Sequence, residues 1–193
     1  MNASGCPSTW ISRFLPAALP GQRLLDVACG SGRHLRLALE RGWGVTGIDR
    51  DLAGVSDLAG RDRVELIRAD LETGAPFPLR DRQFDAVVVT NYLWRPILEE
   101  IVAAVAPGGI LLYETFAAGN ARYGRPSNPD FLLQPGELVD AVRPLLTTIA
   151  YEHATLADPP RIVARIAACG PGHPWLQDPP AMGDAGQVVK PTL

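Results

Sequence analysis

Lysine is almost absent from this 193-residue chain: Lys190 is the only one, and arginine supplies the rest of the 18 basic residues. The arginines are spread along the sequence with acidic residues between them, and the net charge is −3. A nucleic-acid-binding arm would concentrate its basic residues in one run. We therefore expect no dedicated nucleic-acid-binding surface.

Cysteine is also scarce, since only Cys6, Cys29 and Cys169 occur, at wide spacing. This odd number suits neither a disulfide framework nor a zinc site, which predicts a reducing, cytoplasmic location and no bound metal. No apolar run approaches the roughly 20 residues that cross a bilayer, so we expect no membrane span. Arg13 and Pro16 interrupt the apolar stretch near the start, which is therefore not expected to be a cleavable leader.

The remaining composition is that of a globular protein, with 47% hydrophobic and 20% charged residues. A chain of this length builds one sizeable core, which we assign to a single domain at residues 8–169. Residues 170–193 are dense in proline and glycine and have few large apolar side chains apart from Trp175. Such a segment buries too little surface to offset its ordering entropy, so we expect this tail to be mostly disordered.

Short apolar runs alternate with amphipathic stretches, which predicts an α/β domain with a mostly parallel sheet. The last two apolar runs are joined by a short Asp158-Pro159-Pro160 turn and should pair antiparallel. The strands are expected at residues 23–29, 44–49, 63–69, 84–90, 109–115, 145–154 and 161–168, and the helices at 10–15, 31–41, 51–59, 94–106 and 137–143.

A glycine-containing loop, Asp26-Val27-Ala28-Cys29-Gly30-Ser31-Gly32, follows the first strand and leads into a helix. Small residues let a ligand approach the backbone, and free N–H groups at a helix start favour polar ligand groups. Asp49 ends the next strand about twenty residues later, where a carboxylate can accept hydrogen bonds from both hydroxyls of a ribose. The two features together predict a nucleoside cofactor.

Polar groups also end the third and fourth strands. Asp70 and Leu71 follow the third strand, where an adenine ring could be flanked and its amino group bonded. Asn91 and Tyr92 follow the fourth strand. Ligands of open α/β sheets bind outside the carboxyl ends of the strands, so these groups are expected to share one site.

In these motifs, from about Trp10 to Ala168, the chain resembles the class I S-adenosylmethionine-dependent methyltransferases. The resemblance implies a Rossmann-like, seven-stranded and mostly parallel sheet with an antiparallel C-terminal strand and helices on both faces. It implies that S-adenosyl-L-methionine is the cofactor, and that Ala28 departs from the commonest pattern, which has glycine there. The implied cofactor-binding residues are Asp26, Ala28, Cys29, Gly30 and Gly32 around the methionine part, Asp49 with Arg50 at the ribose, Asp70 and Leu71 at the adenine, and Asn91 near the sulfonium.

The stretch from Gly119 to Pro126 and the stretch from Leu132 to Leu138 are similar to the tellurite-resistance branch of these methyltransferases. This second resemblance leaves the substrate open. A nicotinamide dehydrogenase is the main competing interpretation, but its G-x-G-x-x-G fingerprint needs a third small residue. Leu35 or Arg33 occupies that position, depending on where the count begins.

Methyl transfer from a sulfonium is an in-line displacement, so the residues that position the acceptor matter most. Residues 116–134 are too long for an ordinary connection and are expected to cover a small-molecule or metalloid acceptor. Our candidates for acceptor positioning are Asn91, Tyr92, Glu114 and Tyr123, together with Trp94, Phe116, Asn120 and Arg125. Glu114 could act as a base or could fix the loop, and a non-catalytic cofactor-binding partner subunit is the alternative function.

Overall fold

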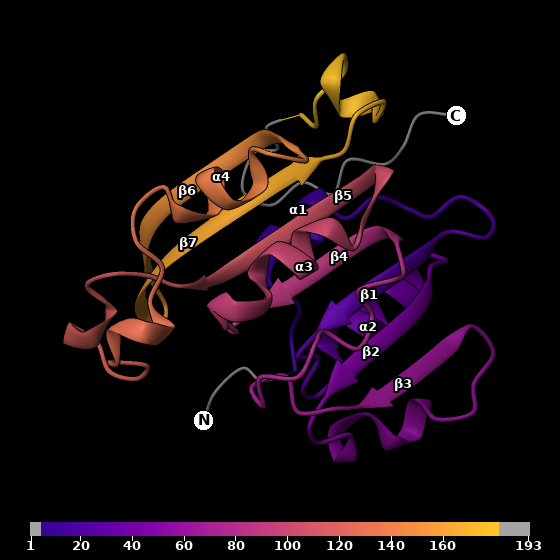
Figure 1. The fold of residues 1–193 in the computed structure, drawn as a ribbon, viewed down its shortest axis with the longest axis horizontal. Coiled ribbons are helices and arrows are strands. Elements are labelled where there is room, and N and C mark those ends of the chain that lie inside the picture. The colour runs from indigo at the N-terminus through magenta and orange to yellow at the C-terminus, as the bar shows by residue number, and fades with distance from the viewer. Residues whose placement is uncertain (1–4, 182–193) are drawn as a thin grey trace.

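The computed structural model describes residues 5–181, which form one seven-stranded sheet in the order β3-β2-β1-β4-β5-β7-β6 (Figure 1). The first five strands run parallel to one another, and β7 runs antiparallel to both of its neighbours. The expected sheet, including its closing antiparallel hairpin, is therefore confirmed. The strands are β1 (Arg23–Val27), β2 (Gly44–Asp49), β3 (Val64–Arg68), β4 (Phe84–Thr90), β5 (Val105–Phe116), β6 (Thr147–Ala157) and β7 (Pro160–Cys169).

Helices cover both faces of the sheet, and each face buries its own apolar cluster. The helices α1 (Thr9–Phe14) and α2 (Arg33–Glu40) pack with the short 3₁₀ helix η1 (Ala53–Leu58) on one face. The opposite face is covered by α3 (Leu98–Ala103) and α4 (Glu137–Val142). Because alternate side chains of every central strand enter different clusters, these strands read as continuous apolar runs in the sequence.

Two expected helices are shorter than the sequence pattern suggests. The segment expected to be helical at residues 51–59 is η1, and Gly54 in it lies against the glycine loop, where an added Cβ would be 2.9 Å from Ser31 Cα. The segment expected at 94–106 divides into the 3₁₀ helix η2 (Arg95–Ile97) and α3. Residues 105–108 extend β5 instead, with a register shift opposite Phe84.

The terminal segments lie partly outside the described residues. Of the expected tail, residues 182–193 lie outside them, whereas residues 170–181 contain the 3₁₀ helix η5 (Pro174–Leu176). The ring of Trp175 contacts the ring of Phe14 edge-on, with centroids 6.1 Å apart. Among residues 5–181, no helix is both long enough and apolar enough to cross a membrane.

The segment after β5 leaves the sheet and returns to it at one point, so we call residues 118–132 the lid. A bridge pairs Ala117 with Leu133 at its base. Inside the lid, the buried Asn120 side chain accepts a hydrogen bond from the Ile162 N–H at 3.0 Å and donates one to the Pro126 carbonyl at 3.1 Å. The sequence predicts that Asn120 helps to position the methyl acceptor. In the structure, its side chain fastens the lid to β7. The lid contains the 3₁₀ helices η3 (Asn120–Arg122) and η4 (Pro129–Phe131).

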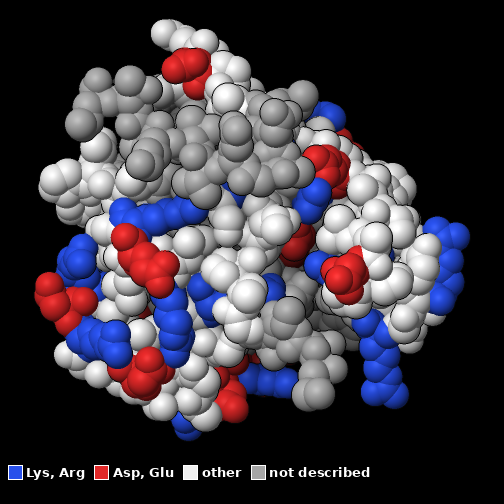
Figure 2. Space-filling model, turned by 180° about the vertical axis from the view of Figure 1, so that it is seen from behind, with Lys and Arg blue, Asp and Glu red and all other residues white. Residues whose placement is uncertain are grey.

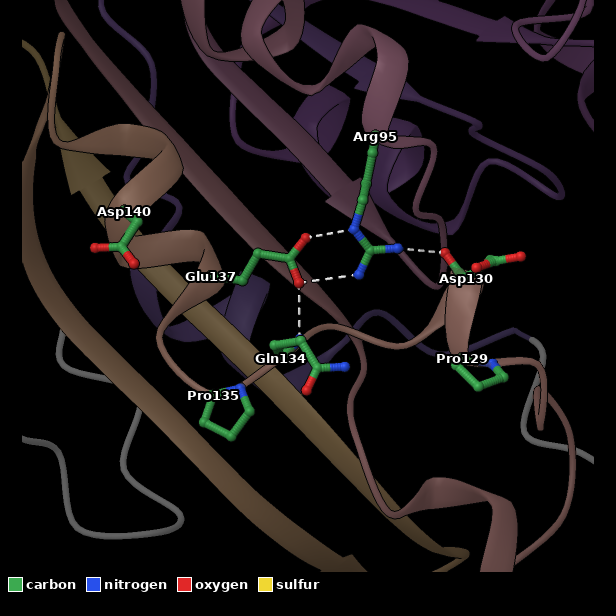
Figure 3. A pocket seen from close by; sticks show the side chains of 7 residues that line it. All are labelled: Arg95, Pro129, Asp130, Gln134, Pro135, Glu137 and Asp140. Carbon is green, nitrogen blue, oxygen red and sulfur yellow. Dashed lines mark hydrogen bonds and ion pairs between the residues drawn. The ribbon is translucent and has the colours of Figure 1, made fainter.

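The returning end of the lid is held by Arg95 (Figure 3). Its guanidinium pairs with both carboxylate oxygens of Glu137 at 2.6 and 2.9 Å, and it donates to the carbonyls of Asp130 and Leu132. These groups border an open groove of about 620 Å³. Because Glu137 already neutralises the charge of Arg95, we assign the residues around this groove the role of anchoring the lid.

Replacing Asn120 tests the attachment of the lid. Asn120→Ala leaves the buried Ile162 N–H without an acceptor, so we expect the free energy of unfolding to fall by about 2 to 3 kcal/mol. Urea denaturation measures this loss. Asn128→Ala is the control, because Asn128 caps only the exposed helix η4 and should cost about 1 kcal/mol or less. Equal losses in the two variants would contradict the anchoring role.

Candidate cofactor and acceptor site

The sheet order reverses at β1, which has β2 on one side and β4 on the other. Ligands of open α/β sheets bind outside the carboxyl ends of the strands at such a switch point. Two non-glycine residues with positive φ flank it: Ala28 after β1, at +55°, and Asn91 after β4, at +54°. This conformation costs roughly 1 to 2 kcal/mol for a residue with a Cβ, and such strain concentrates at functional sites.

Asp26 lies beneath the switch point with only 1% of its surface exposed. Its Oδ2 atom has no hydrogen-bond partner among the described residues. Burial raises the pKa of this carboxyl to about 8, while the nearby Arg33 cation opposes the shift. A buried, unpartnered carboxylate is costly, so the position favours a ligand that supplies a cation or a donor.

The glycine loop folds back onto the end of β2. The Gly30 N–H donates to Asp49 Oδ2 at 2.8 Å, and the Asp51 N–H donates to Asp49 Oδ1 at 2.9 Å. A carboxylate offers about four acceptor positions, so each oxygen of Asp49 can accept one further bond. Asp49 is therefore placed to accept two ligand hydroxyls, as the sequence predicts.

Close packing fixes the shape of this loop. A Cβ on Gly32, which has φ +71°, would meet Val55 Cγ1 at 2.4 Å. Cys29 is 6% exposed, and burial raises the pKa of its thiol above the usual range, so it is a neutral filler here. The loop that was recognised from its glycines is thus also determined by η1, which the sequence did not link to it.

The acids after β2 and β3 converge around Tyr92. Burial raises the pKa of the Tyr92 hydroxyl above its usual range, and the carboxylates of Glu72, Asp70 and Asp49 add to the shift. Tyr92 therefore lies near the acids that follow β2 and β3, where Leu71 is also buried. Its hydroxyl and the Trp94 indole N–H have no partner within residues 5–181. Arg50 is exposed next to Asp49.

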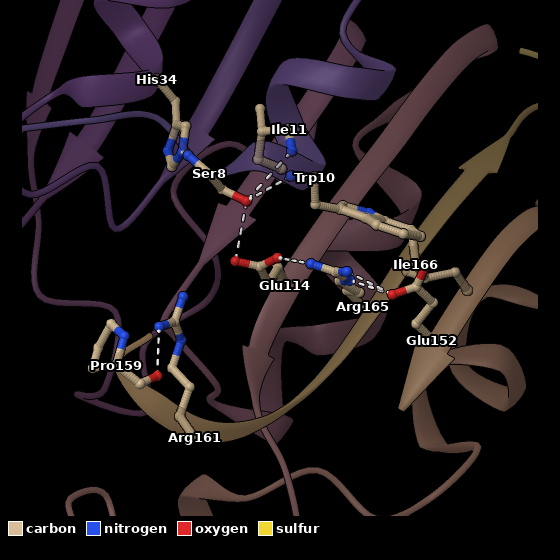
Figure 4. A network of polar contacts seen from close by, with 10 residues as sticks. All are labelled: Ser8, Trp10, Ile11, His34, Glu114, Glu152, Pro159, Arg161, Arg165 and Ile166. Atoms are coloured by element: carbon tan, nitrogen blue, oxygen red, sulfur yellow. Dashed lines mark hydrogen bonds and ion pairs between the residues drawn. The ribbon is translucent and has the colours of Figure 1, made fainter. Parts of the chain in front are cut away.

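Four polar side chains form a row across the other half of the sheet. They are neighbours in register, with Thr90 on β4, Glu114 on β5, Arg165 on β7 and Glu152 on β6. We call them the polar row, and Figure 4 shows three of them, Glu114, Arg165 and Glu152. Arg165 pairs with Glu114 at 3.3 Å and with Glu152 at 2.6 Å. The side chain of Glu114 is 6% exposed, and its other oxygen accepts a hydrogen bond from Ser8 at 3.1 Å. Glu114 thus joins the N-terminal segment to β7 through both of its carboxylate oxygens.

Ser8 joins the N-terminal segment to this row. Its hydroxyl caps α1, and its N–H donates to His34 Nε2 at 3.1 Å. His34 Nδ1 lies 3.4 Å from Thr90 Oγ1, and Arg33 donates to the same hydroxyl and to the Cys6 carbonyl. Sequence reasoning did not link Ser8, His34 and Arg165, because their contacts join segments that are distant in the chain. Arg33 had a signal, since it directly follows the glycine loop.

The lid candidates lie apart from these buried groups. Tyr123 is 44% exposed, and the Arg122 guanidinium lies 5.4 Å from the centre of its ring. Arg125 is exposed, and Phe116 is half-buried at the end of β5. Asn91 is exposed at the switch point, where its N–H donates to the Glu114 carbonyl. Among the acceptor candidates, Asn91 thus has the most open position next to the cofactor loop.

His34 gives the N-terminal contact a pH dependence. Burial and the Arg33 cation lower the pKa of His34 to about 3, below the value of about 6.5 in an unfolded chain. The neutral ring therefore stabilises the fold fully above pH 6.5, and this contribution declines at lower pH by up to about 1.4 kcal/mol per unit. The difference in unfolding free energy between wild type and His34→Gln should shrink from pH 7 to pH 5 in urea titrations. A difference independent of pH would refute a neutral, buried His34.

Comparison with known proteins finds methyltransferases both in sequence and in structure. Residues 24–109 match the family model described as a methyltransferase domain. The ribosomal protein L11 methyltransferase of Burkholderia mallei is 43% identical over 94 residues, which are 47% of this chain and 30% of that protein. The chain thus matches less than a third of that relative's length.

Solved structures share the fold at low sequence identity. An S-adenosylmethionine-dependent methyltransferase from Mesorhizobium loti superposes with a TM-score of 0.62 at 20% identity, covering 82% of this chain and 95% of that one. TehB from Haemophilus influenzae gives a TM-score of 0.62 at 17% identity, covering 83% and 59%. Neither likeness selects one branch. Residues 24–109 thus match a methyltransferase domain in sequence, and the sheet that contains them has the Rossmann-like fold of the solved methyltransferase structures.

Proposed function

We propose that this protein transfers the methyl group of S-adenosylmethionine to a small-molecule acceptor by in-line displacement. The observation that carries the proposal is the buried Asp26 carboxyl, whose Oδ2 atom has no hydrogen-bond partner among the described residues, beneath the strained switch point between β1 and β4. The ammonium group of the cofactor's methionine part would supply the cation that this buried carboxylate lacks. Arg33, whose guanidinium has no carboxylate in ion-pair contact among the described residues, would bind the methionine carboxylate.

The remaining contacts follow along the carboxyl edge of the sheet. Asp49 would accept the two ribose hydroxyls, and Asp70 and Leu71 would contact the adenine beside Tyr92. The sulfonium, when bound, supplies an activated methyl group, and the protein's part is to align the acceptor and exclude water. Alignment alone can contribute about 7 to 11 kcal/mol to lowering the barrier. Asn91 and the underside of the lid are the surfaces that would align the acceptor.

Calorimetry on Asp49→Ala tests the ribose contact. Loss of two hydrogen bonds to a charged acceptor should weaken S-adenosylmethionine binding by about 10- to 100-fold. Asp57→Ala is the control, because Asp57 pairs with Arg36 and Arg61 on the surface of η1. Equal affinity in Asp49→Ala and wild type would contradict the assignment.

Proton release tests the role of Asp26. Its carboxyl, with a pKa of about 8 in the free protein, holds a proton at pH 6.5 and must lose it to pair with the cofactor's ammonium group. Calorimetry in buffers of different ionisation enthalpy should show release of up to about one proton on cofactor binding at pH 6.5. Asp26→Asn should remove this release. Equal release by both proteins would exclude the proposed pairing.

Turnover separates the enzyme from a non-catalytic cofactor-binding subunit. Protein incubated with methyl-labelled S-adenosylmethionine and a metabolite extract should transfer label to a low-molecular-weight product, and Asp49→Ala should transfer much less. Cofactor binding without label transfer to any fraction would favour the non-catalytic alternative.

A further inference from the structure

Arg161 lies beyond the carboxyl end of β5, in the half of the sheet that carries the polar row. It lies at the start of β7, two residues before Val163, which pairs with Phe116 at the carboxyl end of β5. Side chains alternate along a strand, so Arg161, Val163 and Arg165 face the same side of the sheet. Figure 4 shows the Arg161 guanidinium directed toward the side on which Glu114 and Ser8 lie.

The charge of Arg161 is not neutralised by the residues that the structure describes. Its one hydrogen bond goes to the Pro159 carbonyl at 3.1 Å, and Asp158 in the same turn forms no ion pair with it. Arg165, four residues further along the same face, is held between two carboxylates. The two arginines therefore differ in function, because Arg165 belongs to the polar row while Arg161 keeps its donors available.

Most arginines remote from the lid are paired with acids. On η1, β3 and α4, ion pairs join Arg36 to Asp57, Arg82 to Glu65 and Arg143 to Asp140. Around the lid, Arg95 pairs with Glu137, whereas Arg122, Arg125 and Arg161 form no ion pair within residues 5–181. The same is true of five arginines elsewhere, which are Arg13, Arg33, Arg41, Arg50 and Arg68. In Figure 2, blue and red side chains alternate at the lower left, whereas blue side chains project at the right-hand edge.

Two buried side chains among the described residues on this side of the site are already in hydrogen-bond contacts. Glu114 is bound by Ser8 and Arg165. The two ring nitrogens of His34 face Ser8 and Thr90, and its pKa is lowered to about 3. An acceptor that must lose a proton before methylation would have to share these groups with their present partners, whereas an acceptor that is already an anion needs no base.

We propose that Arg161 binds a small oxyanion, such as a carboxylate, as the methyl acceptor. This inference rests on the proposed methyl transfer and names its substrate class. The guanidinium fork matches the geometry of a carboxylate or phosphate and donates two parallel hydrogen bonds to it. One oxygen stays bound to Arg161 while the other attacks.

The step balances without a proton. The acceptor oxygen forms a bond to the methyl carbon, the carbon–sulfur bond breaks, and its electron pair stays on sulfur. The acceptor loses one negative charge and the sulfonium its positive charge, so a monocarboxylate becomes a neutral ester and the sulfonium becomes a thioether.

The direct test compares matched acceptors. Full-length protein and labelled S-adenosylmethionine are incubated with benzoate, malonate, phosphate or sulfate, and in parallel with benzamide and malonamide. The same assay is run on metabolite extract divided by anion exchange. We expect label in an oxyanion arm or in the retained fraction, and Arg161→Gln should lower kcat/KM by about 10- to 100-fold, mainly through KM. Arg161→Lys should keep part of the activity, and Arg143→Gln, at the exposed α4 ion pair, should keep all of it.

A binding measurement separates this inference from the proposed function. With S-adenosylhomocysteine bound, benzoate or sulfate should protect Arg161 from phenylglyoxal, read by mass spectrometry, and should leave Arg143 unprotected. Protection without any turnover would keep the oxyanion site and overturn the proposed transfer. Label transfer only to neutral or cationic acceptors, or unchanged kinetics in Arg161→Gln, would overturn the oxyanion site and keep the transfer. Absence of both protection and transfer would overturn both.

Discussion

The burial of one carboxylate, that of Asp26, constrains the rest of the cofactor side. An acid removed from water in this way is unfavourable for the fold alone, because no described residue bonds its Oδ2 atom. The loop above it is held in place by other means, through the Gly30 bond to Asp49 and the close packing of Gly54 against Ser31. Gly30 and Ser31 therefore hold the loop in shape, whereas Asp26 at its start is left for the ligand. Ala28, with its strained backbone, lies between them in the sequence.

The sheet could be read from the sequence because its strands are apolar runs with clear ends. The loop, Asp49 and the closing hairpin follow from local patterns and from the way parallel strands align their carboxyl ends. The length of η1 could not be read in this way, because Gly54 is placed by contact with a loop over twenty residues earlier. Helical spacing is a local signal, and close backbone contact between segments overrides it.

The acceptor side was less accessible to sequence reasoning, for a physical reason. Glu114 has the residue type of a base, but its partners Ser8 and Arg165 come from the first ten residues and from β7. Asn120 is a residue type that can bind a substrate. Its amide nitrogen and its amide oxygen, however, both form hydrogen bonds with the protein's own backbone. A residue type indicates which chemistry is available, and only the fold determines whether its lone pairs and protons are already used.

The bond between Asn120 and Ile162 has a consequence for how the acceptor is selected. It connects the lid to β7, whose second residue is Arg161, so the lid and Arg161 are parts of one connected unit. Arg95 fixes the far end of the lid to α4. A lid that is fastened at both ends favours an opening that is already formed before the ligand binds. In such a site, the size and charge of the opening under the lid would select the acceptor, and no closure of the lid would be needed. Changes of specificity in related sequences would then arise from the β6–β7 turn as readily as from the lid itself.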